Sequence, residues 1–163
     1  DAVSACVILA EIAAWAKDQG LSLYQLLQKI YVEYGFSKEK GISVVKKGKS
    51  GAEEIEAMMK KFRENPLTEI AGSKVTYFYD YSTLKGKDYA ENETVTLDMP
   101  TTSNVLQYFT EDNTKVSIRP SGTEPKIKFY CEVHSKVKSI DELPEAEKAA
   151  EEKINQIKAS LGI

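Results

Sequence analysis

The chain has 163 residues, which suits one domain or one domain with part of a second. Its 42% of hydrophobic and 29% of charged residues are typical of a globular protein, and the net charge of −3 argues against a general nucleic-acid binder. Cys6 and Cys131 lie in apolar runs, so we expect buried, reduced thiols in a cytoplasmic protein. The sequence shows neither a signal peptide nor an apolar run long enough to span a bilayer.

Two helices are predicted at the start of the chain. Residues 1–20 are rich in helix-forming residues and apolar almost all the way round, which favours a helix buried on several sides. We therefore expect the chain to begin inside a larger protein. Ser22 and Gln25 have the spacing of a capping box that opens a second helix, and Gly35 ends it.

The pattern then changes, and we place a domain boundary between residues 1–37 and residues 38–163. A strand is expected over residues 41–47. It leads into a helix over residues 49–66, with Ser50 at its N-cap and apolar side chains on one face.

The second half of the chain predicts a sheet closed by a helix. Strands are expected at residues 73–81, 95–99, 104–109, 115–119 and 126–133. Residues 82–93 read as a polar connection. Short polar turns join the last three strands, which indicates an antiparallel meander. A terminal helix begins near Pro144, since proline is tolerated in the first turn of a helix.

The stretch "SIRPSGTEPKIKFY", residues 117–130, carries the strongest functional signal. Alternation along the strands places Arg119 and the lysines on the face opposite the core. The loop adds the hydroxyls of Ser121 and Thr123, and Gly122, whose backbone can approach a ligand closely. A guanidinium, hydroxyls, amides and a nearby lysine together suit a phosphate monoester. The alternative is a polar hairpin whose hydroxyls bind their own backbone.

The motif "RPSGTEPKIKFY" resembles the C-terminal phosphate-binding loop of the α-D-phosphohexomutases, the phosphoglucomutase and phosphomannomutase group. Arg119 and the residues Ser-Gly-Thr-Glu-Pro stand in the family's order between two strands. The resemblance implies a phosphate site made by Arg119, Ser121, Gly122, Thr123, Lys126 and Lys128. Lys128 stands where many relatives carry a second arginine, so it keeps the charge but not the bidentate fork.

The resemblance covers the whole chain and implies an α+β fold. Residues 38–163 resemble the family's fourth domain, an antiparallel sheet covered by helices on one face, of the TATA-box-binding-protein-like type. Residues 1–37 resemble the two helices that close its third domain, an α/β domain of which the rest would be truncated.

By the same resemblance, the parent enzyme moves a phosphoryl group between the 1- and 6-positions of a hexose through a phosphoserine. It uses Mg²⁺ and a hexose 1,6-bisphosphate. The family's serine, metal loop and sugar loop lie upstream, so we expect no catalytic residue and no metal ligand here, and an inactive fragment. The expected partners are a hexose phosphate and the missing N-terminal domains of the same chain, with no nucleic acid and no membrane. The alternative is a stand-alone, non-enzymatic module that binds an anion or a partner.

Two weaker motifs point to other functions. Residues 43–50, "SVVKKGKS", nearly match a nucleotide-binding P-loop, but Ser43 replaces its first glycine. The alternative for these residues is a strand that leads into a capped helix. Lys46, Lys47 and Lys49 would then form a solvated patch. Tyrosines at alternate positions 77, 79 and 81 could stack on bases, but packing within the sheet explains them as well.

Overall fold

The computed structural model describes residues 1–46 and 48–163, without the side chain of Lys49. Lys47 and that side chain, both part of the predicted lysine patch, lie outside the described residues. Within them, no helix is both long and apolar enough to cross a membrane. The chain divides into two units, the first made of residues 1–37 and 135–148, the second of residues 38–134 and 149–163.

The first unit contains helices α1 (Ala2–Asp18) and α2 (Leu23–Tyr34), together with the short helix η1 (Ile140–Glu142). The predicted capping box is confirmed. The Ser22 hydroxyl accepts a hydrogen bond from the Gln25 amide, and the Gln25 side chain accepts one from the Ser22 amide. Two of the free N–H groups at the start of α2 are therefore satisfied by side chains.

Helix α1 presents uncovered apolar side chains. Ala16 is its one buried residue, whereas these large apolar residues are exposed: Val3, Val7, Ile8, Leu9, Ile12 and Trp15. Cys6 is exposed as well, so the expectation that both cysteines are buried is wrong for Cys6 and confirmed for Cys131. An apolar run predicts burial only where another element covers the helix, and α1 is uncovered along most of its length in its unit.

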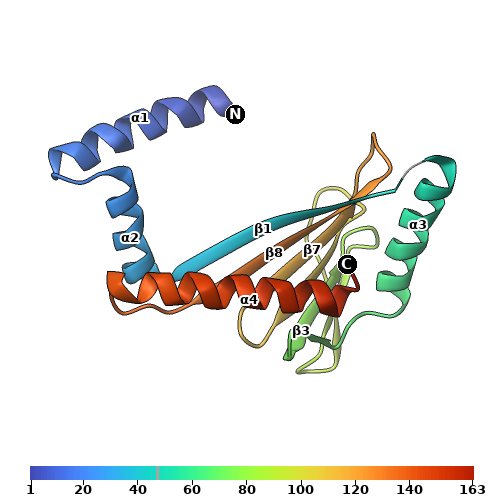
Figure 1. Cartoon of the computed structure of the whole chain (residues 1–163). Coiled ribbons are helices and arrows are strands. Elements are labelled where there is room, and N and C mark those ends of the chain that lie inside the picture. Colours follow the sequence, from blue (N-terminus) through green and yellow to red (C-terminus); the bar gives the residue numbers. More distant parts are fainter. Residues whose placement is uncertain (47) are drawn as a thin grey trace. The chain divides into compact units, whose positions relative to one another are not determined.

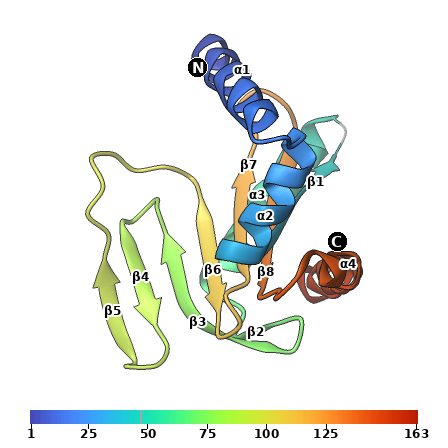
Figure 2. The same ribbon diagram turned by 90° about the vertical axis from the view of Figure 1, so that its left-hand side faces the viewer.

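An eight-stranded antiparallel sheet dominates the described part of the chain (Figures 1 and 2). Its strands are β1 (Phe36–Val45), β2 (Glu69–Ile70), β3 (Ser73–Asp80), β4 (Lys85–Asp88), β5 (Glu93–Thr96), β6 (Leu106–Thr110), β7 (Lys115–Pro120) and β8 (Lys126–Ser135). The order is β1-β8-β7-β6-β3-β4-β5, and β2 pairs with β3. The α+β class and the meander of β6, β7 and β8 are confirmed.

Helices α3 (Gly48–Glu64) and α4 (Leu143–Leu161) supply the rest of the core. Alternate residues of β6, β7 and β8 are buried, which leaves one face of these strands apolar and the other polar. The Phe62 ring of α3 meets Phe129 of β8 edge-on, with 6.1 Å between ring centroids. The other buried apolar residues of the two helices are Ile55, Met59, Leu143, Ala150, Ile154, Ile157 and Leu161.

The structure corrects three local predictions. Strand β1 begins at Phe36, five residues before the expected strand. Helix α3 begins at Gly48, so Ser50 lies inside the helix and is not its N-cap. Strand β4 lies within residues 82–93, which were expected to be a polar connection. Its sequence Lys-Gly-Lys-Asp has no apolar residue, so hydrophobic alternation could not indicate a strand there.

Gly86→Ala should destabilise the sheet. Gly86 of β4 lies opposite Tyr79 of β3. A Cβ atom on Gly86 would overlap the Tyr79 ring and lie 2.9 Å from the backbone oxygen of Phe78. Because the backbone oxygen cannot move away freely, we expect a loss of about 1–3 kcal/mol in the free energy of unfolding. Urea denaturation measures it, and Gly122→Ala, where a Cβ meets no described atom within 4 Å, is the control. Equal stability of the two variants would contradict the close packing.

Candidate functional site

The loop between β7 and β8 is a stiff connection with its ends tied together. The Ser121 amide donates to the Lys126 carbonyl over 2.8 Å, and the Lys126 amide donates to the Glu124 carbonyl over 2.7 Å. Pro120 and Pro125 stand at the two ends of the loop and reduce the freedom of the unfolded chain. The Lys46 amide donates to the Pro125 carbonyl over 2.9 Å, which ties the loop to the end of β1.

Arg119 and Lys128 face each other across the β7–β8 pair. Their neighbours Ile118, Ile127 and Phe129 are fully buried, so alternation places both cations on the opposite face of the sheet. Two like charges directly opposed in an antiparallel pair repel each other. Within the described part of the chain, neither cation has an ion-pair partner or a side-chain hydrogen bond. An anion bound beside them would relieve the repulsion.

Lys126 is engaged within the loop itself. Its ammonium group forms an ion pair with the Glu124 carboxylate. The hydrogen bond and the charge of Lys126, with a smaller contribution from the charge of Lys128, lower the pKa of Glu124. The predicted ligand Lys126 would therefore have to be shared between Glu124 and a bound anion.

The tip of the loop offers donors without partners. Among the described residues, the hydroxyls of Ser121 and Thr123 and the amides of Gly122 and Thr123 make no hydrogen bond. The hairpin alternative, in which those hydroxyls bind their own backbone, is therefore not what the structure shows. Gly122 has no positive φ, and a Cβ there would meet no described atom within 4 Å. Neither backbone strain nor packing explains a glycine at this position.

The same loop forms one wall of a cavity of about 740 Å³. Helix α3 forms the other wall, and Ile55 and Met59 supply its apolar part. The full lining consists of Gly48, Ala52, Ile55, Glu56, Met59, Lys60, Arg63, Asn104 and residues 120–125. Arg119 and Lys128 are not in this lining. The loop thus stands between the two cations on one sheet face and the cavity beside α3.

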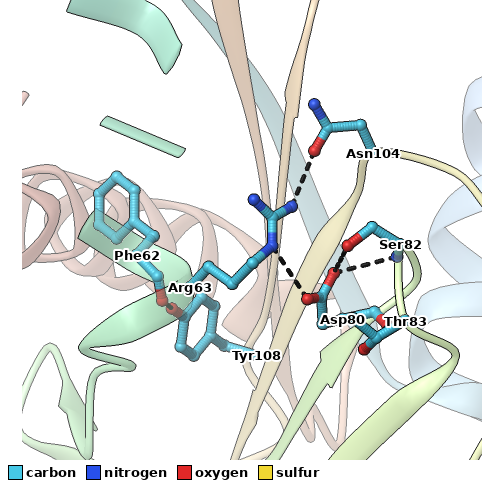
Figure 3. A network of polar contacts seen from close by, with 7 residues as sticks. All are labelled: Phe62, Arg63, Asp80, Ser82, Thr83, Asn104 and Tyr108. Carbon is cyan, nitrogen blue, oxygen red and sulfur yellow. Dashed lines mark hydrogen bonds and ion pairs between the residues drawn. The ribbon is translucent and has the colours of Figure 1, made fainter. Parts of the chain in front are cut away.

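A polar network that the sequence did not predict lies at this cavity (Figure 3). Arg63 of α3 donates through Nε to Asp80 Oδ2 over 2.9 Å and through Nη2 to Asn104 Oδ1 over 2.8 Å. The other oxygen of Asp80 accepts from the amide and the hydroxyl of Ser82, over 3.0 and 2.7 Å. Asp80 and Asn104 lie 17 and 41 positions from Arg63 in the sequence, and no motif joins the three residues.

A second contact holds the turn of α3 that carries Arg63. The Tyr108 hydroxyl of β6 donates to the Phe62 carbonyl over 2.9 Å, and burial raises the pKa of Tyr108. A buried hydroxyl needs such a partner, and this one ties α3 to the middle of the sheet.

The other motifs noted in the sequence do not form a binding site within the described residues. The described residues contain no group of three or more His, Cys, Asp or Glu side chains that could hold a metal ion. In the P-loop-like stretch, residues 43–45 belong to β1 and Gly48 begins α3, so a strand runs almost directly into a helix. Tyr79 packs against Phe109 and Tyr77 within the sheet, with centroids 5.3 and 5.9 Å apart.

Comparison of the sequence with known families finds a match over most of the second unit. The sequence profile described as "Phosphoglucomutase/phosphomannomutase, C-terminal domain" matches residues 42–150. The chain therefore belongs to the phosphoglucomutase/phosphomannomutase family and corresponds to its C-terminal domain.

The similar curated proteins are much longer than this chain. The phosphoglucomutase of Staphylococcus haemolyticus is 34% identical over 134 residues, which cover 82% of this chain and 24% of the relative. That of Staphylococcus saprophyticus is 31% identical over 143 residues, 88% of this chain and 25% of the relative. The chain thus spans about a quarter of the length of these relatives. A crystal structure of the Paramecium phosphoprotein pp63/parafusin, a phosphoglucomutase, in its open form aligns with a TM-score of 0.38 at 15% identity, over 72% of this chain and 19% of that one.

Gly122→Ala separates a structural role of the loop from a binding role. Because the added methyl meets no described atom, stability should stay unchanged or rise by up to about 1 kcal/mol. Affinity for inorganic phosphate should fall about tenfold, about 1.4 kcal/mol, if the ligand approaches the loop backbone. Calorimetric titration and thermal unfolding measure the two effects, with Gly41→Ala in β1 as a matched added methyl outside the loop. Unchanged phosphate affinity in Gly122→Ala would show that the ligand does not approach this glycine.

Proposed function

We propose that this chain holds the phosphate group of a hexose phosphate on behalf of a phosphohexomutase, through Arg119, Ser121, Gly122, Thr123, Lys126 and Lys128. The observation that carries the proposal is the opposed pair of Arg119 and Lys128, neither of which forms an ion pair with another described residue. The pair stands at the base of a loop in which the hydroxyls of Ser121 and Thr123 and the amides of Gly122 and Thr123 are unused among the described residues. Such an arrangement suits a dianion with several acceptor oxygens.

Each group has a distinct part in this binding. Arg119 can donate two parallel hydrogen bonds to two phosphate oxygens, whereas Lys128 contributes a point charge. The loop amides and hydroxyls reach the remaining oxygens. Lys126 can exchange the Glu124 carboxylate for the phosphate, because both are oxyanions that accept hydrogen bonds from its ammonium group and the Glu124 side chain is 59% exposed to water.

In the longer enzyme, this domain would position the substrate and leave the chemistry to other parts. Fixing the phosphate that is not transferred keeps the opposite end of the sugar in line with the group that reacts. The described residues do not fit a Mg²⁺ site, so we assign no step to a metal in this chain. We expect Mg²⁺ and hexose 1,6-bisphosphate to bind mainly to the other domains of the longer enzyme. We also expect this chain alone to be inactive as a mutase.

Three substitutions test the proposal by phosphate affinity. Arg119→Ala should weaken binding of inorganic phosphate by about a hundredfold, about 3 kcal/mol, because a charge-assisted bidentate contact is lost. Arg119→Lys should recover only part of it, since the fork is missing. Thr123→Val should cost about 1 kcal/mol, because one neutral hydrogen bond is lost while the backbone amide stays. Isothermal titration of the three variants measures these differences.

Thermal unfolding of the same variants is the control. Arg119 is exposed and has no partner among the described residues, so its removal should leave the melting temperature nearly unchanged. A structural hairpin would give the reverse pattern. A large fall in melting temperature in Arg119→Ala, combined with wild-type phosphate affinity per folded molecule, would rule out the phosphate-binding function.

A further inference from the structure

Arg63 and Asn104 present two donor groups that have no partner within the described residues. Nε of Arg63 is used by Asp80 and Nη2 by Asn104, which leaves Nη1. Arginine has no acceptor, so the amide oxygen of Asn104 must face it and Nδ2 must point elsewhere. Figure 3 shows Nη1 and this amide nitrogen on the side of the network away from Asp80.

The network holds these donors in place, and Asp80 neutralises the charge of Arg63. The Asp80 side chain is only 8% exposed and forms an ion pair with Arg63. Ser82 holds Asp80 in turn, through its amide and its hydroxyl. A guanidinium balanced by a buried carboxylate attracts a second anion less than a free one does, yet its N–H groups remain good donors. The pair therefore suits neutral acceptor oxygens, such as hydroxyl groups.

Both residues line the cavity that the loop of residues 120–125 also lines. Its volume of about 740 Å³ lies within the range of roughly 300–1,000 Å³ for small-molecule sites. The cavity lining also includes the buried side chains of Ile55 and Met59. Lys60, which also lines the cavity, lies within ion-pair distance of Glu64, at 3.8 Å.

We infer that Arg63 and Asn104 donate hydrogen bonds to hydroxyl oxygens of the sugar whose phosphate the loop holds. The domain then recognises the sugar as well as the phosphate. This inference rests on the proposed function, because it requires the phosphate to be bound at the tip of the loop, whose residues 121–123 line the cavity although Arg119 and Lys128 do not. It makes Arg63 and Asn104 specificity-determining residues, with Asp80 as the residue that positions Arg63.

The test compares two phosphate monoesters, one with a sugar and one without. Isothermal titration of the whole chain gives the dissociation constants of glucose 1-phosphate and methyl phosphate. In the wild type, glucose 1-phosphate should bind about tenfold more tightly, as two added neutral hydrogen bonds would give. Asn104→Ala should reduce this ratio about threefold while methyl phosphate binds as before. Arg63→Lys, which keeps a cation for Asp80, should reduce it similarly, and Asn155→Ala on α4 should leave it unchanged.

The outcomes separate the inference from the function beneath it. Equal affinity of the wild type for the two esters, or an unchanged ratio in Asn104→Ala, overturns the inference and leaves the phosphate site intact. Failure of the wild type to bind either ester overturns the proposed function, and the inference with it. A fall in the affinity for both esters by the same factor in Asn104→Ala assigns this residue to the shape of the loop, which also overturns the sugar contact.

Discussion

Burial of every second side chain on β6, β7 and β8 beneath the helices constrains the rest of the second unit. Once Ile118 and Phe129 lie in the core, the residues between them must face the other way. Arg119 and Lys128 thus face each other on the polar side of two neighbouring strands. The apolar alternation of the two strands therefore places Arg119 and Lys128 together on the polar face of the sheet.

Helix α3 links this core to the candidate site. One of its faces contributes Phe62 to the core, and neighbouring positions line the cavity behind the loop. Two contacts hold its C-terminal end, the Arg63–Asp80 ion pair and the Tyr108–Phe62 hydrogen bond. Because Asp80 is buried, removal of Arg63 would leave an unpaired carboxylate in the interior, which is costly. The shape of the cavity wall thus depends on a polar contact at the far end of the helix.

The sequence predicts much of the fold where the patterns are apolar and local. Alternation located β6, β7 and β8 and their meander, and the spacing of Ser22 and Gln25 located a helix start. Strand β4 could not be found in this way, because its four residues carry no apolar side chain and its pairing depends on contacts with β3 and β5. The expected burial of Cys6 is wrong, since burial depends on a neighbouring element and not on the helix alone.

Likewise, the sequence predicts the part of the candidate site that is local in the chain and not the part that depends on packing. The loop of residues 119–125 is contiguous, so its residue types and order can be recognised without a structure. Arg63 and Asn104 come together only through the packing of α3 on the sheet, and neither carries a local signal. The ion pair of Lys126 with Glu124 likewise required coordinates, although the two residues are close in sequence, because the turn between them sets the direction of both side chains.

Amide chemical shifts test most directly whether phosphate binds at the tip of the β7–β8 loop. A titration of the ¹⁵N-labelled chain with inorganic phosphate should move the resonances of Ser121, Gly122 and Thr123. These shifts should saturate with one shared dissociation constant, while resonances on α4 stay in place. Shifts that remain linear with phosphate concentration, or saturable shifts confined to other parts of the chain, would contradict the claim.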